Sequence, residues 1–141
     1  MLIQVSRRLE NITSIGDTLS IVSNASLTHI SGLGSLTEIG GDLWIYDNAS
    51  LTHISGLGRL TSIGEYLFIL TNASLTDLSG LYSVEQVGLD LSIQSNASLT
   101  NLSGLENLTY IWGSLRLYNN ASLTNLSGLY SVERIVDNLS I

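Results

Sequence analysis

The sequence of 141 residues contains no cysteine and no proline, and it has only one phenylalanine and five basic residues. Without cysteine, the chain has neither a disulfide framework nor a thiolate metal site. Five basic side chains are too few for the positive stripe that phosphate contacts require, so we expect no nucleic-acid partner and no anionic membrane partner. No apolar run approaches the ~20 residues of a membrane-spanning helix, so we expect no membrane insertion.

What the sequence does contain is mostly aliphatic and small polar. Hydrophobic residues make up 44% of the chain and charged residues only 12%, with a net charge of −7. A mostly helical surface would normally be rich in Glu and Lys, so this composition argues against a helical protein. The absence of proline agrees with strands whose N–H groups must all pair with a neighbour.

A 24-residue repeat dominates the chain. The tripeptide Asn-Ala-Ser recurs at this spacing without insertion or deletion, which indicates that each turn follows the same path. We therefore predict a single repeat domain over residues 1–141. It divides into a partial N-terminal cap (1–8), a degenerate turn (9–23) and repeats at 24–47, 48–71, 72–95, 96–119 and 120–141. Residues 1–8 lack the pattern of a signal peptide and the last turn stops at Ile141, so we expect a processed chain, a filament subunit or a piece of a longer array.

The aliphatic residues occupy seven columns, one residue per turn in each. Leu43-x-Ile45 alternates with period 2 and predicts a strand, whereas the run from Leu27 to Ile39 has period 3 and predicts short extended pieces joined by bends or 3₁₀-like turns. Glycines such as Gly32 and Gly40 mark the expected corners, where a positive φ would favour glycine. The fold class is an all-β-type repeat solenoid, a parallel β-helix of about five to six 24-residue turns.

The repeat resembles a known family. The stretch of residues 67–72, Leu-Phe-Ile-Leu-Thr-Asn, is similar to the leucine-rich-repeat pattern Leu-x-Leu-x-x-Asn. The stretch from Ser98 to Ile111 resembles the receptor L-domain type, as in ligand-binding domains of insulin- and epidermal-growth-factor-type receptors and related microbial surface proteins. The resemblance covers about residues 9–141 and implies an extracellular or cell-surface location. The lack of cysteine favours a microbial or engineered surface protein over an animal receptor.

The invariant asparagine column has two interpretations. One is a structural ladder, in which each side chain turns inward and bonds to backbone groups and to the next asparagine: Asn24, Asn48, Asn72, Asn96 and Asn120. The other is N-glycosylation, because every Asn-Ala-Ser is an acceptor sequence. Further acceptor sequences lie off this column, at Asn101, Asn107 and Asn125, and also at Asn11 and Asn138. We favour the ladder for the invariant column and keep glycosylation as a prediction for the others.

A Ser-x-Thr pair also recurs in every turn. Its members are Ser26, Thr28, Ser50, Thr52, Ser74, Thr76, Ser98, Thr100, Ser122 and Thr124. If the segment were a strand, the two hydroxyl ranks would point outward, as in β-solenoid ice-binding proteins. The alternative is that serine and threonine simply suit exposed strand positions and ladder hydrogen bonds.

The positions that differ between turns are the remaining signal. At outward positions of and beside the predicted strand the chain carries Trp44, Tyr46, Tyr66, Phe68, Leu70, Arg116 and Tyr118. A sheet that faces water would normally carry small polar residues there, as at Ser20, Ser92 and Ser140. The larger residues form either a contact surface for protein or sugar, or a set of cross-strand pairs that stabilise the sheet.

We find no pattern typical of an enzyme or of a metal or cofactor site. The acidic residues fall in several columns without a repeated cluster, and His29 and His53 have no third zinc ligand. We therefore expect no catalytic residues, no metal and no cofactor. The expected function is a non-catalytic extracellular or cell-surface scaffold that binds protein, including further copies of itself end to end. The alternatives are an ice-binding solenoid and a carbohydrate-binding surface protein.

Overall fold

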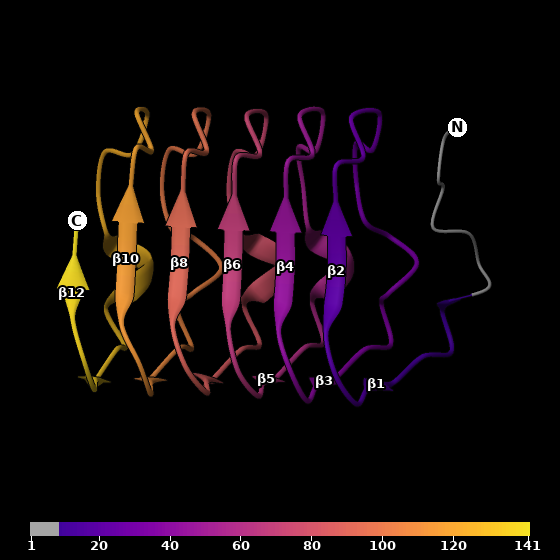
Figure 1. Ribbon diagram of the computed structural model, residues 1–141, viewed down its shortest axis with the longest axis horizontal. Helices are drawn as coiled ribbons and strands as arrows, with labels where there is room; N and C mark the ends of the chain where they lie inside the picture. The colour runs from indigo at the N-terminus through magenta and orange to yellow at the C-terminus, as the bar shows by residue number, and fades with distance from the viewer. Residues whose placement is uncertain (1–8) are drawn as a thin grey trace.

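The computed structural model describes residues 9–141, which form a stack of similar turns drawn out along one axis (Figure 1). The expected solenoid is confirmed: each turn contributes one strand to each of two parallel sheets. The first sheet consists of β1 (Ser14–Ile15), β3 (Glu38–Ile39), β5 (Ser62–Ile63), β7 (Gln86–Val87), β9 (Tyr110–Ile111) and β11 (Arg134–Ile135). The second consists of β2 (Leu19–Val22), β4 (Leu43–Tyr46), β6 (Leu67–Leu70), β8 (Leu91–Gln94), β10 (Leu115–Tyr118) and β12 (Leu139–Ser140).

The strands of successive turns pair in a register of 24 residues, which is the length of the sequence repeat. Leu43 in β4 pairs with Leu67 in β6, which pairs with Leu91 in β8, so each residue lies beside its equivalent 24 positions away. On the side away from the sheets, the period-3 segment forms short 3₁₀ helices, η2 (Ser55–Leu57), η3 (Ser79–Leu81) and η4 (Ser127–Leu129). Both predictions made from the two periods are therefore confirmed.

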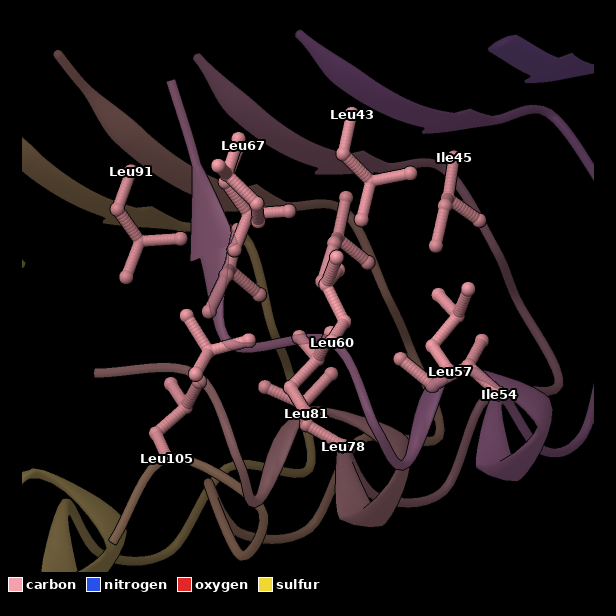
Figure 2. Packing of buried hydrophobic residues seen from close by; sticks show 14 of the residues in the cluster. Leu43, Ile45, Ile54, Leu57, Leu60, Leu67, Leu78, Leu81, Leu91 and Leu105 are labelled. Atoms are coloured by element: carbon pink, nitrogen blue, oxygen red, sulfur yellow. The ribbon is translucent and has the colours of Figure 1, made fainter. Parts of the chain in front are cut away.

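The core lies between the second sheet and the 3₁₀ segments. Figure 2 shows Leu43, Leu67 and Leu91 projecting from their strands toward residues such as Leu60 and Leu81 on the opposite side. All five of these side chains have no solvent exposure. Burying an aliphatic side chain stabilises a fold by about 1.5–3 kcal/mol, so stacking turns supplies stability that one turn alone cannot.

The asparagine ladder is confirmed by its hydrogen bonds. Asn72 Oδ1 accepts from the backbone N–H and from the Nδ2 of Asn48, both at 3.2 Å. Asn72 Nδ2 donates to the carbonyl of Ile45 at 2.9 Å and to that of Leu70 at 3.1 Å. The same pattern links Asn72 to Asn96, so the side chains satisfy buried backbone groups where the chain leaves the second sheet.

The corners do not use glycine as we expected. The residue just before each ladder asparagine has a positive φ and is not glycine, as at Asp47 (57°) and Thr71 (58°). Among glycines of the described residues only Gly104 has a positive φ, of 113°. Gly80 is required for a different reason, because an added Cβ would lie 1.8 Å from the carbonyl oxygen of Ile54 in the preceding turn. Close approach of two backbones explains that glycine column, in which Gly104 also has the positive φ.

The ends of the repeat differ from its middle. Residues 9–23 form the degenerate turn, and its aliphatic side chains Ile12, Ile15 and Leu19 are only partly buried. The predicted cap at residues 1–8 lies outside the described residues.

Candidate binding surface

The outer face of the second sheet carries the residues that differ most between turns. Strand alternation buries Leu43 and Ile45 of β4 and turns Trp44 and Tyr46 outward. The same alternation places the other predicted contact residues of the second sheet on this face: Phe68, Leu70, Arg116 and Tyr118. Tyr66 comes directly before β6 and is also partly exposed. We call the aromatic and apolar members on β4 and β6, with Tyr66, the β4–β6 strip.

The aromatic rings of the β4–β6 strip pack against one another. The ring centroids of Trp44 and Phe68 are 4.7 Å apart with the planes at 89°, and Tyr66 stacks on Phe68 at 5.2 Å. Tyr46 is 40% exposed at the edge of the group. The two interpretations of this strip therefore coexist, because the rings form cross-strand pairs and still present a partly exposed apolar surface.

Asp42 fixes the orientation of this cluster. Its Oδ2 accepts a hydrogen bond from Trp44 Nε1 at 3.0 Å, and its Oδ1 accepts from the backbone N–H of Tyr66 at 3.1 Å. One carboxylate thus holds the indole and ties it to the next turn. A contact surface whose side chains are held in place loses less conformational entropy when it binds.

Arg116 and Tyr118 lie on the same face two turns away, in a more polar setting. Arg116 forms an ion pair with Asp90, which occupies the position equivalent to Asp42 and accepts the N–H of Ser114 at 2.7 Å. Burial alone would raise the pKa of Asp90, but the bonds from Ser114 and Arg116 outweigh it and lower the pKa below its ordinary value of 3.8. The hydrogen bond to Asp90 raises the pKa of Arg116. Arg116 is therefore held by a neighbour, while Tyr118 remains 37% exposed.

The Ser-x-Thr segment is not part of either sheet. Its threonines stack turn upon turn, and the hydroxyl of Thr52 donates to the carbonyl of Thr28 at 3.0 Å. Thr124 makes the same bond to the carbonyl of Thr100 at 3.1 Å, and Ser74 Oγ donates to the carbonyl of Ala49. These hydroxyl protons are thus directed along the solenoid axis into backbone carbonyls rather than outward.

The acceptor sequences for glycosylation fall into two groups. Asn48, Asn72 and Asn96 are fully buried in the ladder. The three predicted off-column sites are at least partly accessible, and the side chain of each makes a hydrogen bond with a backbone group. Asn101 and Asn125 accept the backbone N–H two residues ahead, at 2.9 and 3.1 Å, and Asn107 Nδ2 donates to the carbonyl of Tyr82.

His29, His53 and Asp77 occupy the same position in three successive turns. The backbones of His29 and His53 pair in an isolated parallel bridge, and His53 Nδ1 lies 4.0 Å from Asp77 Oδ2. Burial would raise the pKa of Asp77, but hydrogen bonds from Ser79 and Thr76, together with His53, lower it overall. Over residues 9–141, no group of three or more acidic, histidine or cysteine side chains could hold a metal ion.

A second exposed aromatic pair escaped the sequence reasoning. Tyr110 and Trp112 stack with their centroids 5.8 Å apart and their planes at 19°, and Trp112 is 50% exposed. The pair lies on the first sheet and at the corner that follows it. A signal was present, because Trp112 stands 24 residues after Gly88 in a column that holds glycine at positions 16, 40 and 64 as well.

No helix in the described part of the chain has the length and apolarity to span a bilayer. Comparison of the chain with protein-family models, with curated proteins and with solved structures gave no match.

Proposed function

We propose that this protein is a non-catalytic scaffold at the cell surface or outside the cell, and that it binds another protein through the β4–β6 strip. The observation that carries the proposal is the outward aromatic cluster on β4 and β6. In the equivalent column other turns have Ser20, Ser92 and Ser140, so the fold itself does not require an aromatic ring there. Aromatic side chains are enriched where proteins contact one another.

The extracellular location rests on the L-domain-like pattern of the repeat. Function on such scaffolds belongs to the surface residues rather than to the fold, which is why the proposal is tied to the strip. The partner is either a different surface protein or another copy of this chain.

The proposal is tested by returning the strip to the residue of the other turns. In the variant carrying Trp44→Ser and Phe68→Ser, both changes are to a residue that the sheet already accepts at this column. Sedimentation over a concentration series measures self-association, and immobilised protein exposed to extracellular fluid measures capture of other proteins. We expect the variant to keep the circular dichroism spectrum of the parent chain. It should lose either the self-association or the captured protein that the parent chain shows in these two measurements.

The proposal fails if parent and variant retain the same proteins and sediment identically. A glycan array tests the carbohydrate alternative. If the parent chain binds a sugar and the variant does not, the strip binds sugar instead of protein. The ice-binding alternative depends on the Thr52 column, whose hydroxyls donate to backbone carbonyls. This geometry supports a structural role for the column, and thermal hysteresis of the purified chain is the measurement that would reverse that preference.

A further inference from the structure

A second exposed apolar surface lies at the corner between the two sheets, away from the β4–β6 strip. It consists of Leu89, Tyr110, Trp112 and Val136, which we call the Trp112 patch. Leu89 and Val136 are 37% and 40% exposed, and Trp112 is the most exposed of the tryptophans at 50%. The backbone N–H of Gly113 donates to the carbonyl of Leu89, so Leu89 lies beside the residue that follows Trp112.

The fold does not explain why a tryptophan stands at position 112. In the four preceding turns this column is glycine, and at Gly64 and Gly88 an added Cβ would lie 2.0 and 1.8 Å from the carbonyl oxygen of the glycine one turn earlier. The chain thus places its largest side chain in a column that holds glycine in all four earlier turns and Val136 in the following one. Half of that side chain is exposed, so it adds little to the core.

The indole is held in place rather than loose on the surface. It stacks on Tyr110, and its Nε1 donates to Gln86 Oε1 at 3.4 Å. The Tyr110 hydroxyl in turn donates to Glu133 Oε2 at 3.2 Å. A stacked pair tethered at both ends offers a partner a preformed aromatic platform.

The charges around the Trp112 patch are mostly negative. Glu85 and Glu133 flank Thr109 in the adjoining column, since Thr109 N–H donates to the carbonyl of Glu85 and Glu133 N–H donates to that of Thr109. Glu65 lies one turn before Leu89, and Asp137 follows Val136. Two guanidinium groups accompany these four carboxylates. One belongs to Arg134, whose backbone pairs with Tyr110. The other belongs to Arg116, which is already paired with Asp90 and also interacts with Asp137.

An aromatic platform surrounded by carboxylates attracts cations, because the negative potential draws them in and the ring face binds them. We propose that the Trp112 patch is a docking site for a basic segment of a partner protein, in which arginine or lysine alternates with apolar residues. The guanidinium or ammonium packs on the Tyr110–Trp112 pair and faces Glu133, while the apolar residues cover Leu89 and Val136. A second copy of this chain fits less well, because it has only five basic residues and a net charge of −7.

The test uses the full chain and a dye-labelled short peptide of alternating arginine and leucine, followed by fluorescence anisotropy. The decisive variant is Trp112→Gly, which restores the residue of the preceding turns and so preserves the fold. We expect it to raise the peptide Kd about tenfold, the size of a lost cation–π contact. The Glu133→Gln, Asp137→Asn double variant should also weaken binding, and added salt should do so in the parent chain.

Two controls separate this site from the β4–β6 strip and from simple charge attraction. Trp44→Ser should leave the peptide Kd unchanged, so failure of the strip proposal and failure of this one are distinguishable. A peptide of alternating glutamate and leucine should not bind. The proposal is overturned if the basic peptide does not bind, if Trp112→Gly binds it as tightly as the parent, or if the acidic peptide binds equally well. It is also overturned if the parent self-associates through this surface, shown by loss of the dimer in Trp112→Gly.

Discussion

Removing one central amide of the asparagine ladder should destabilise the protein far more than removing the first. In Asn72→Ala, the lost carboxamide leaves the backbone N–H of Asn48 without its acceptor and the carbonyl of Ile45 without one of its donors. Two bonds accepted by Oδ1 and three donated by Nδ2, to the carbonyls of Ile45 and Leu70 and to Asn96 Oδ1, disappear at a site with no solvent exposure. At roughly 1 kcal/mol for each of these five bonds, Asn72→Ala should lower the free energy of unfolding by about 5 kcal/mol.

Asn24→Ala is the matched control. Asn24 is only partly buried, and its side chain donates two bonds, to the carbonyl of Val22 and to Asn48 Oδ1. We expect that variant to lose about 1 kcal/mol. Urea denaturation followed by circular dichroism compares the two, with the slope checked because repeat proteins can unfold in parts. Equal losses in the two variants would refute the view that the buried amides stabilise the solenoid.

Three further changes test other features of the turn. Thr71→Asn should raise the free energy of unfolding by about 0.5–1 kcal/mol, because a β-branched residue is strained at a φ of 58° and asparagine tolerates it. Thermal melts should show this as a higher midpoint temperature. Gly80→Ala should destabilise the protein by more than ~3 kcal/mol in urea denaturation, because its Cβ would collide with the carbonyl of the preceding turn. Gly34→Ala is the control and should leave the stability unchanged, because an added Cβ there has nothing within 4 Å. Asp90→Asn should lower stability at pH 7 but not well below pH 3.8. The folded state lowers the pKa of Asp90, so the ionised carboxylate stabilises the fold above the ordinary pKa of 3.8, and this stabilisation is lost as the pH falls through the lowered pKa. If this were wrong, the urea midpoints of the parent and the variant would differ by the same amount at both pH values.

The sequence predicted most of the fold because the repeat encodes it redundantly. The alternation of Leu43 and Ile45 indicated the strand that the structure has as β4, and the strict spacing implied the parallel register. The two-residue strands of the first sheet, such as β5, gave no alternating pattern of their own. Such short pairings follow from stacking of turns and are not visible in local periodicity.

The corners were harder to predict, because two backbone demands look alike in sequence. A glycine that recurs can mean a positive φ or a close approach between chains. In this protein Gly80 meets the carbonyl of the preceding turn, while the positive φ falls on Thr71, a residue type that avoids it. Only coordinates separate the two, since a recurring glycine can meet either demand.

The surface residues raise a different question, which is how to tell a substitution that the fold tolerates from one that serves a partner. Trp44 and Trp112 each replace a small residue of their column, yet they do so at different structural positions. The column of Trp44 lies on an open sheet face where serine alternates with larger residues, so an aromatic residue there is compatible with the backbone. The column of Trp112 is one where neighbouring turns leave no room for a Cβ at Gly64 and Gly88. Packing does not explain a half-exposed ring among carboxylates in a column that holds glycine in four earlier turns. This makes Trp112→Gly the more informative of the two reversions.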